Sequence, residues 1–237
     1  MSFLTWHWLF GLLALWASIA LCCLWYIIPE TLPPEKCHPI AFKKIIAGYW
    51  HILSHQTFML NSLISGCAFD AMIAWICASS FVVLITFHYT LVQYGFIQGI
   101  VFAGFIIGAR FVQWGIDRFS LQTILSISIS LMLLSSLSML AVILVYVHTL
   151  WVLIIPMMIF ALGAGLSFSI LNRLAVEASD APMGLKMAIS SSLATLFAVL
   201  GSLIASAFVN NLQAFSLCIA VLSGIAFLLY RFFFRLP

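Results

Sequence analysis

Residues 28–44, with the sequence IPETLPPEKCHPIAFKK, are where a very apolar chain first becomes polar. This stretch holds four of the seven prolines, two of the six acidic residues and three of the nine basic residues. Prolines break a helix and charges are costly inside a bilayer, so a membrane-spanning chain leaves the membrane here. The side on which it leaves sets the orientation of every later span.

The composition on both sides of this stretch is that of an integral membrane protein. Of 237 residues, 65% are hydrophobic and only 6% are charged, whereas a soluble domain carries roughly 25% charged residues. So few charges cannot cover a folded chain of this length in water. The formal charge of +3 does not indicate nucleic acid, because the basic residues follow a membrane-topology pattern. We expect the lipid bilayer as a partner and no nucleic acid.

Seven apolar runs are each long enough to cross a bilayer, which takes about 20 residues of helix. The predicted spans are 4–28, 57–82, 93–115, 122–147, 151–173, 187–209 and 213–231. The predicted fold class is therefore all-α integral membrane, since a membrane β-barrel needs short alternating strands. We divide the chain into a first span at 1–28, a cytoplasmic loop with an amphipathic helix at 29–56, and a six-helix bundle at 57–237.

Every basic residue falls on the same side of these spans. The nine are Lys36, Lys43, Lys44, Arg110, Arg118, Arg173, Lys186, Arg231 and Arg235. The positive-inside rule makes that side the cytoplasm, so we expect the N-terminus outside and the C-terminus inside. We expect no cleavable signal peptide, because the first apolar run is too long for one and no basic residue precedes it.

Residues 40–55, IAFKKIIAGYWHILSH, predict an amphipathic helix lying in the membrane interface, with Tyr49 and Trp50 at headgroup depth. His51 and His55 have the spacing of a zinc pair on a helix. However, the H-E-x-x-H glutamate is missing and no third ligand is evident. The six cysteines also lack metal-binding spacing, so we expect no metal and no cofactor.

Asp70 is the only charged residue in the span 57–82. A carboxylate at the bilayer centre costs a few kcal/mol and often faces a cavity or a partner. Gly66, Asp70, Ala74 and Cys77 form one narrow stripe on a helix, mostly of small residues. Asp70 is therefore a candidate proton- or cation-sensitive carboxylate of a transport pathway. The alternative is a protonated, hydrogen-bonded acid with a structural role.

The span 93–115 carries two G-x-x-x-G pairs, Gly95 with Gly99 and Gly104 with Gly108. The first pair lies opposite the second on the helix, so we expect close packing on two sides, one neighbour for each half.

Two further charged positions are candidates for function. Asp117 and Arg118 lie at the end of the third span. They form either a charge latch between helices or a solvated turn with a cation at the helix end. Arg173 lies within a turn of the apolar part of the fifth span, and either points into a cavity or snorkels to the interface. The signatures G-x-S-x-G, H-E-x-x-H and the P-loop are all missing, so we expect no enzyme.

Four segments, in this order, carry a family resemblance: PETL at 29–32, AWICASS at 74–80, GFIQGIVFAGFIIGARF at 95–111 and LGAGLSFSILNRLAVEASDAPMGLKMAIS at 162–190. Together they resemble the second half of a major facilitator superfamily drug:proton antiporter, of the Bcr/CflA and MdfA-like multidrug efflux kind. The resemblance covers almost the whole chain.

This resemblance implies that the seven spans are helices six to twelve of a twelve-helix transporter of the inner membrane. Spans two to four and five to seven would then be two inverted three-helix repeats. The family function is proton-coupled efflux of drugs or small amphipathic molecules, so the implied partners are such a substrate and protons. Because alternating access needs two halves, we expect no transport by this chain alone. The resemblance thus predicts a truncated or a split transporter, and a split one would work with a separately encoded N-terminal half or a second copy.

Among the candidate residues, Trp75 and Arg173 carry over from the family, near its cavity and on its helix ten. Asp70 does not match a family acid. Of the cytoplasmic pattern G-x-x-x-D-R-x-G-R, Asp117 and Arg118 remain, while the last glycine and arginine are replaced.

The alternative to a partial transporter is a seven-helix membrane protein that does not transport, either a scaffold or a receptor. Residues 117–119, Asp-Arg-Phe, resemble the D-R-Y placement of G-protein-coupled receptors. The last span lacks N-P-x-x-Y, which argues against a receptor.

Overall fold

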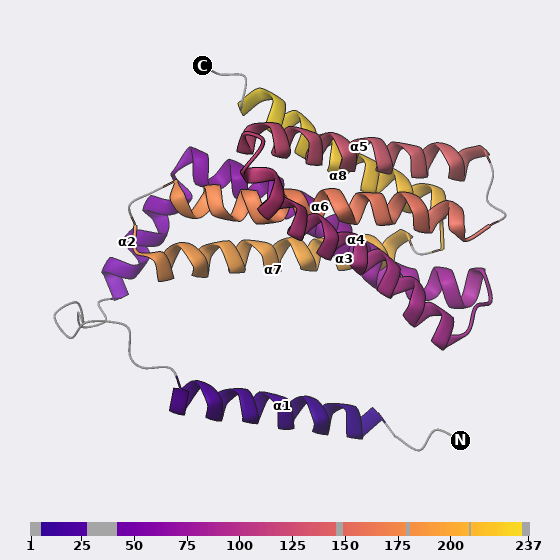
Figure 1. Ribbon diagram of the computed structural model, residues 1–237, viewed down its shortest axis with the longest axis horizontal. Helices are drawn as coiled ribbons and strands as arrows, with labels where there is room; N and C mark the ends of the chain where they lie inside the picture. The colour runs from indigo at the N-terminus through magenta and orange to yellow at the C-terminus, as the bar shows by residue number, and fades with distance from the viewer. Residues whose placement is uncertain (1–5, 28–41, 146–148, 179–180, 209, 234–237) are drawn as a thin grey trace. The chain divides into compact units, whose positions relative to one another are not determined.

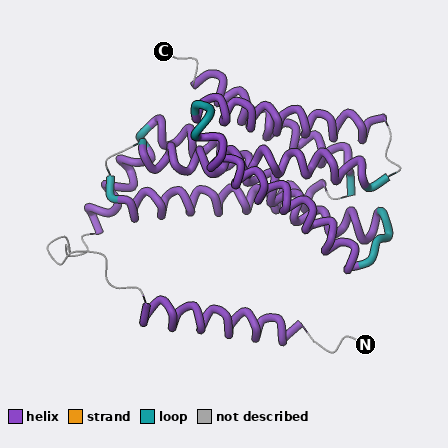
Figure 2. The backbone as a smooth tube through the Cα atoms, viewed as in Figure 1, coloured by secondary structure: helices purple, strands orange, loops and turns teal. Residues whose placement is uncertain are grey.

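The structure is a computed structural model that describes residues 6–27, 42–145, 149–178, 181–208 and 210–233 (Figure 1). All of its regular elements in these ranges are helical (Figure 2). They are α1 Trp6–Ile27, α2 Phe42–Leu53, α3 Gln56–Phe81, the π-helical segment η2 Val82–Thr86, α4 Leu91–Ile116, α5 Leu121–Val145, α6 Trp151–Glu177, α7 Met183–Phe208 and α8 Leu212–Phe233.

Seven of the described helices are long and apolar enough to cross a membrane, which confirms the all-α fold class. They are α1 and α3 to α8, and the third helix continues through η2 to give 31 residues from Gln56 to Thr86. The helices extend beyond the predicted spans mainly at their polar ends. Helix α6, for example, continues past Arg173 to Glu177, because a helix does not stop where the hydrocarbon stops.

The chain divides into two compact units, Met1–Phe42 and Lys43–Pro237. The first contains α1, a single apolar helix of 22 residues. The second contains α2 and the six-helix bundle α3 to α8. Helix α2 packs on this bundle through Ile52, which is buried with Phe58 of α3, Ala175 of α6 and Ile189 of α7. A helix is therefore present in the predicted region, with part of its apolar face covered by protein, while its position in the membrane interface stays a prediction.

The bundle is arranged as two related sets of three helices, α3 to α5 and α6 to α8. Helix α4 packs along α6, and α7 packs along α3 in the same way (Figure 1). Helix α5 packs against α6 and α8, while α8 packs against α3 and α5. If α3, α4 and α5 are exchanged with α6, α7 and α8 in that order, every one of these helix pairs becomes a pair that also packs together. A pair of structural repeats requires this correspondence.

Glycines allow the closest of these contacts, between α4 and α6. A Cβ atom on Gly104 would lie 2.6 Å from the carbonyl oxygen of Met158, and one on Gly108 would overlap the carbonyl of Leu162. On the facing helix, a Cβ on Gly165 would overlap the carbonyl of Phe105. Only hydrogen fits at these positions, so the backbones touch directly.

The first glycine pair of α4, Gly95 with Gly99, lacks within the described chain the close neighbour that the sequence predicts. Nothing in the described structure lies within 4 Å of a Cβ placed on Gly95 or Gly99, and both residues are exposed. Helix α4 lies at the edge of the bundle, so only its Gly104 and Gly108 side meets α6. The expected second close neighbour of α4 is not among the described residues.

Candidate functional site

An apolar hollow of about 140 Å³ lies between α3, α4 and α6. We call it the aromatic recess. Its lining residues are Ala68, Phe69, Met72, Ile73, Ile76, Phe102, Phe105, Ala164 and Phe168. The rings of Phe69 and Phe168 stack with centroids 5.8 Å apart, and Phe105 lies against Phe168 at 6.3 Å. This is a rigid aromatic surface suited to a flat apolar ligand group.

Local sequence explains how the three rings meet. The contact between Gly165 and the carbonyl of Phe105 holds α4 against α6, and Phe168 follows Gly165 by about one helical turn. Ala68 and Ala164 are small, so they leave the space that the aromatic recess occupies. Helical spacing predicts none of this, because the rings come from three separate helices.

Trp75 does not line the aromatic recess; it is almost fully buried between α3 and α4, with 1% of its surface exposed. Its indole Nε1 donates to Oε1 of Gln98 at 3.1 Å. Nε2 of Gln98 donates to the hydroxyls of Ser79 and Tyr94, both at 2.9 Å. The Ser79 and Tyr94 hydroxyls are 3.2 Å apart and share a further hydrogen bond.

These four residues, Trp75, Ser79, Tyr94 and Gln98, form what we call the polar cluster. Tyr94 and Gln98 are not among the residues predicted from the sequence. A signal was present, since both are polar, lie four residues apart in an apolar span and therefore share a helix face. The cluster joins α3 to α4 by hydrogen bonds that an apolar environment makes costly to break.

Asp70 lies on a different side of α3, toward α7. It is 2% exposed, and its Oδ1 atom has no hydrogen-bond partner among the described residues. A Cβ on Gly201 of α7 would lie 2.5 Å from both Oδ1 and the backbone oxygen of Asp70. The predicted stripe of small residues on α3 is therefore the face that packs on α7.

Arg173 lies near the C-terminal end of α6. Its Nε donates to Oε1 of Glu177 at 2.8 Å, and both side chains are more than half exposed, at 54% and 56%. This placement matches the interfacial alternative for Arg173 better than a position inside a cavity.

Asp117 and Arg118 form the exposed turn after α4. The carbonyl of Gly115 accepts from the backbone N–H groups of Arg118, at 3.1 Å, and Phe119, at 2.8 Å. Within the described part of the chain neither Asp117 nor Arg118 forms an ion pair. The charge latch therefore stays a prediction.

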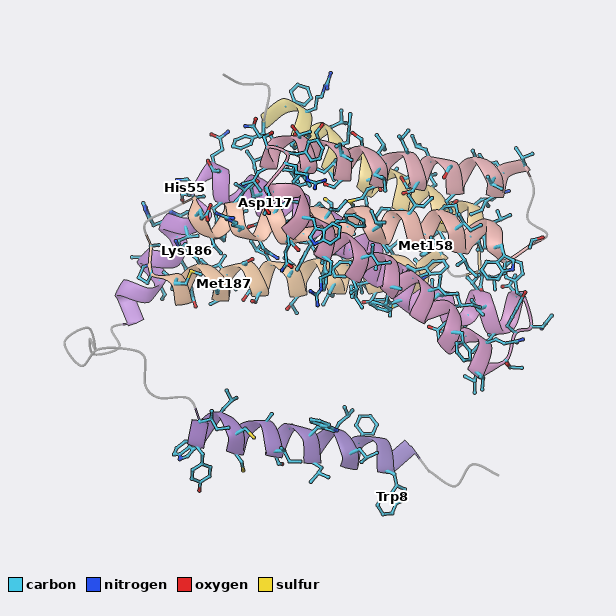
Figure 3. The ribbon with its side chains drawn as sticks, in the orientation of Figure 1. Trp8, His55, Asp117, Met158, Lys186 and Met187 are labelled. Carbon is cyan, nitrogen blue, oxygen red and sulfur yellow. The ribbon has the colours of Figure 1, made fainter. Side chains whose placement is uncertain are left out.

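Polar and charged side chains gather at one end of the bundle. Figure 3 shows Asp117, His55 and Lys186 toward the end where α2 lies, while Met158 lies nearer the other end. Lys186 caps the C-terminal end of α6, since its Nζ donates to the carbonyl of Val176 at 2.6 Å. This position is favourable for a cation because the carbonyl end of a helix is partly negative.

The structure does not bring the sequence-predicted residues together in one site. Asp70 faces α7, Trp75 faces α4, and Arg173 is exposed near the end of α6. His51 and His55 line an open hollow beside Glu177. Among the described residues no three His, Cys, Asp or Glu side chains are placed to hold a metal ion.

Comparison with known proteins places this fold in a family. The sequence model of the Major Facilitator Superfamily matches residues 1–183, which is most of the chain. The chain therefore belongs to the Major Facilitator Superfamily, a superfamily of membrane transporters, and the resemblance found in the sequence is confirmed.

Two relatives are similar over most of the chain. It is 27% identical over 230 residues to the chloramphenicol resistance protein CraA of Acinetobacter baumannii, covering 96% of this chain and 54% of that protein. It is 25% identical over 198 residues to the multidrug transporter MdfA of Yersinia pestis, covering 83% of this chain and 48% of that protein. The chain thus spans about half the length of the curated relatives it matches.

Proposed function

We propose that this chain forms helices six to twelve of a proton-driven exporter of small amphipathic molecules, and that it transports only together with a first half. We take it as a transporter rather than an enzyme, in line with its superfamily. The observation that carries the proposal is the set of small and polar residues that α4 and α7 leave exposed among their apolar side chains.

Helix α7 is less covered by protein than α4. In the most apolar part of each helix, 11% of the residues are buried in α7, against 28% in α4 and 61% in α6. Its exposed residues include Ser191, Ser192 and Thr195 along the membrane-spanning part. Polar groups on an exposed side at this depth favour a neighbouring protein or water over hydrocarbon.

Helix α4 supplies the second part of this observation. Gly95 and Gly99 leave an open strip without side chains, which is the surface on which another transmembrane helix packs most closely. The exposed turn at Asp117 and Arg118 is available to form the predicted cytoplasmic latch with a first half.

The size of the aromatic recess agrees with an incomplete binding site. Pockets for small molecules usually measure about 300–1,000 Å³, whereas this recess measures about 140 Å³. We propose that it takes the apolar part of an amphipathic substrate and that a first half completes the site. Trp75, which the polar cluster holds in place, and Arg173 are the further pathway residues that we propose.

We propose an inner-membrane location, with the N-terminus outside and the C-terminus in the cytoplasm. The one-sided distribution of basic residues supports this orientation. Single cysteines at His88 and at Asp117, each in a cysteine-free chain, test it with a membrane-impermeant maleimide on intact cells. We expect labelling at position 88 and protection at position 117; the reverse pattern would invert the topology.

The transport proposal is tested by co-expression. The chain is produced alone, and together with the first five helices of the CraA or MdfA relative, in cells that lack their own exporters. We expect no chloramphenicol resistance from the chain alone and partial resistance from the pair. Strong export by the chain alone would contradict the need for a first half.

A matched pair of variants links export to the aromatic recess. Phe168→Ala removes the ring that stacks on Phe69, so we expect it to lower export by the pair. Phe232→Ala removes an equally large ring that is 76% exposed at the end of α8, so we expect export to persist. Equal export by the two variants, at equal membrane levels, would argue against the recess as a substrate surface.

A further inference from the structure

Helices α3 and α7 pack side by side in the same direction and in constant register. Gly66 of α3 meets the ring of Phe197, and Asp70, one turn later, meets Gly201, one turn after Phe197. The 2.5 Å separations from a Cβ on Gly201 to Oδ1 and to the backbone oxygen of Asp70 leave no room for any other residue there. We call this contact the α3–α7 seam.

One oxygen of the Asp70 carboxyl, Oδ1, is enclosed in this seam without a hydrogen-bond partner among the described residues. Oδ1 is inaccessible to solvent and receives no hydrogen bond from the described residues. Gly201 has no side chain with which to donate one. Burial without a partner disfavours an ionised carboxylate because the lost hydration is not replaced, so the closed seam suits the neutral acid.

Charged and titratable groups on the surrounding helices lie elsewhere. On the elements that pack against α3 they are Tyr94 and Arg110 of α4, Arg173 and Glu177 of α6, Lys186 of α7, and Cys218, Tyr230 and Arg231 of α8, while α3 itself adds Cys67 and Cys77. Arg173 pairs with Glu177, Lys186 binds the carbonyl of Val176, and the Tyr230 hydroxyl donates to the carbonyl of Gln122. Cys67 lies about one helical turn before Asp70 on α3 and is also buried.

A hollow lies about two turns farther along the same seam. A recess of about 310 Å³ is lined by Cys77 and Phe81 of α3 and by Ser202, Ala205 and Ser206 of α7. Ser202 directly follows Gly201. The hydroxyls of Ser202 and Ser206 donate to carbonyls of their own helix, which leaves their oxygens free to accept from water. We call this hollow the cysteine recess.

We propose that Asp70 is a proton-binding site that loads through the cysteine recess and closes the α3–α7 seam when it is protonated. The carboxylate takes a proton from hydronium, leaving water, and the reverse step returns the proton. The ionised form needs hydration, and at Gly201 water fits beside the carboxyl only when the two helices separate. Protonation thus selects between a closed and an opened seam.

The chemistry around Asp70 favours a proton over a metal cation. Hard cations such as Ca²⁺ take 6–8 oxygen ligands. The seam offers the oxygens of Asp70 itself and a glycine without a side chain. This inference rests on the proposed function, because it names the residue through which proton binding would act on this half of the transporter.

Cys77 provides a direct probe, because its thiol is exposed in the cysteine recess. The test uses the full chain with Cys77 as its only cysteine, in native membranes, and measures the rate of alkylation by N-ethylmaleimide from mildly acidic to mildly alkaline pH. Asp70→Asn carries the same thiol, so it corrects for ionisation of Cys77. From the acidic to the alkaline end of this series, we expect the alkylation rate to rise about fivefold more in the chain with Asp70 than in Asp70→Asn. This is the size expected when ionisation of Asp70 shifts the chain from the closed to the opened seam.

A second readout does not depend on the thiol. Infrared difference spectra between mildly acidic and mildly alkaline pH should show the carbonyl stretch of a protonated carboxyl. This band should vanish in Asp70→Asn. Glu177→Gln is the matched control, since that carboxyl is exposed and ion-paired. We expect it to keep both the band and the response of Cys77.

Identical pH responses in the chain with Asp70 and in Asp70→Asn would overturn the proposal, as would loss of both signals in Glu177→Gln. The failure of this inference can be told from failure of the proposed function. Export by the paired halves without any Asp70-dependent signal would leave the function standing and reject the proton site. The Asp70-dependent signal without export by any pairing would do the reverse.

Discussion

The α4–α6 and α3–α7 contacts occupy corresponding places in the two sets of three helices, and they differ in the residues that meet the glycines. In the first, Gly104 and Gly108 meet the backbone carbonyls of Met158 and Leu162. In the second, Gly201 meets the backbone carbonyl of Asp70. Glycine against a carbonyl therefore builds a close helix pair with apolar residues alone. The carboxyl of Asp70 is not needed for that contact, so its presence calls for another reason.

The largest effect should come from disturbing the apolar contact. Gly108→Ala places a methyl group on the backbone of Leu162, which cannot move aside as a side chain could. We expect the free energy of unfolding in detergent to fall by about 3 kcal/mol. The matched control is Gly95→Ala, which enters open space and should change stability by no more than about 1 kcal/mol, in the stabilising direction. Equal losses would show that the contact is not tight.

Making the two contacts alike should have the next largest effect. Asp70→Met gives the α3–α7 seam the kind of residue that Met158 supplies in the other contact. We expect about 2 kcal/mol of added stability, because a buried carboxyl without a partner is removed. The pH response of Cys77 should disappear with it. A clear loss of stability in the same unfolding assay would instead make Asp70 a structural residue.

The polar cluster is expected to contribute less than either contact. Gln98→Ala leaves Nε1 of Trp75 and the hydroxyls of Ser79 and Tyr94 without their shared partner. We expect a loss of about 1 kcal/mol in the unfolding free energy, since hydrogen bonds between membrane helices are modest. Gln113→Ala, at an exposed position on the same helix, should cost nothing measurable. A similar loss in both variants would reduce the effect of Gln98 to helix propensity.

The smallest effect on stability is expected at the end of α6. Arg173→Gln breaks an exposed ion pair with Glu177, which is worth at most about 0.5 kcal/mol. Glu177→Gln should give the same small change. Export by the paired halves separates the two readings of Arg173: a selective loss in Arg173→Gln would make it a pathway residue, and unchanged export would leave it as an interfacial anchor.

Sequence alone predicted the parts of this structure that depend on one helix at a time. Apolar length predicted the seven spans, and helical period predicted that Gly66, Asp70, Ala74 and Cys77 share a face. It could not predict that this face meets Gly201, because helix pairing depends on residues more than a hundred positions apart.

The same limit explains what the sequence missed at the candidate site. The aromatic recess takes its rings from three helices, and the polar cluster takes its members from two. The spacing of Gly95 and Gly99 shows that a close neighbour could fit there, but it does not say whether this chain supplies one.

The open strip at Gly95 and Gly99 has a consequence for how a partner would be chosen. A surface made of absent side chains offers no charge and no hydrogen bond that could distinguish one incoming helix from another. Any helix with small side chains along its contacting face can pack on it. We therefore expect first halves from different relatives to be interchangeable at this strip, and fidelity of assembly to depend on groups at the membrane surface.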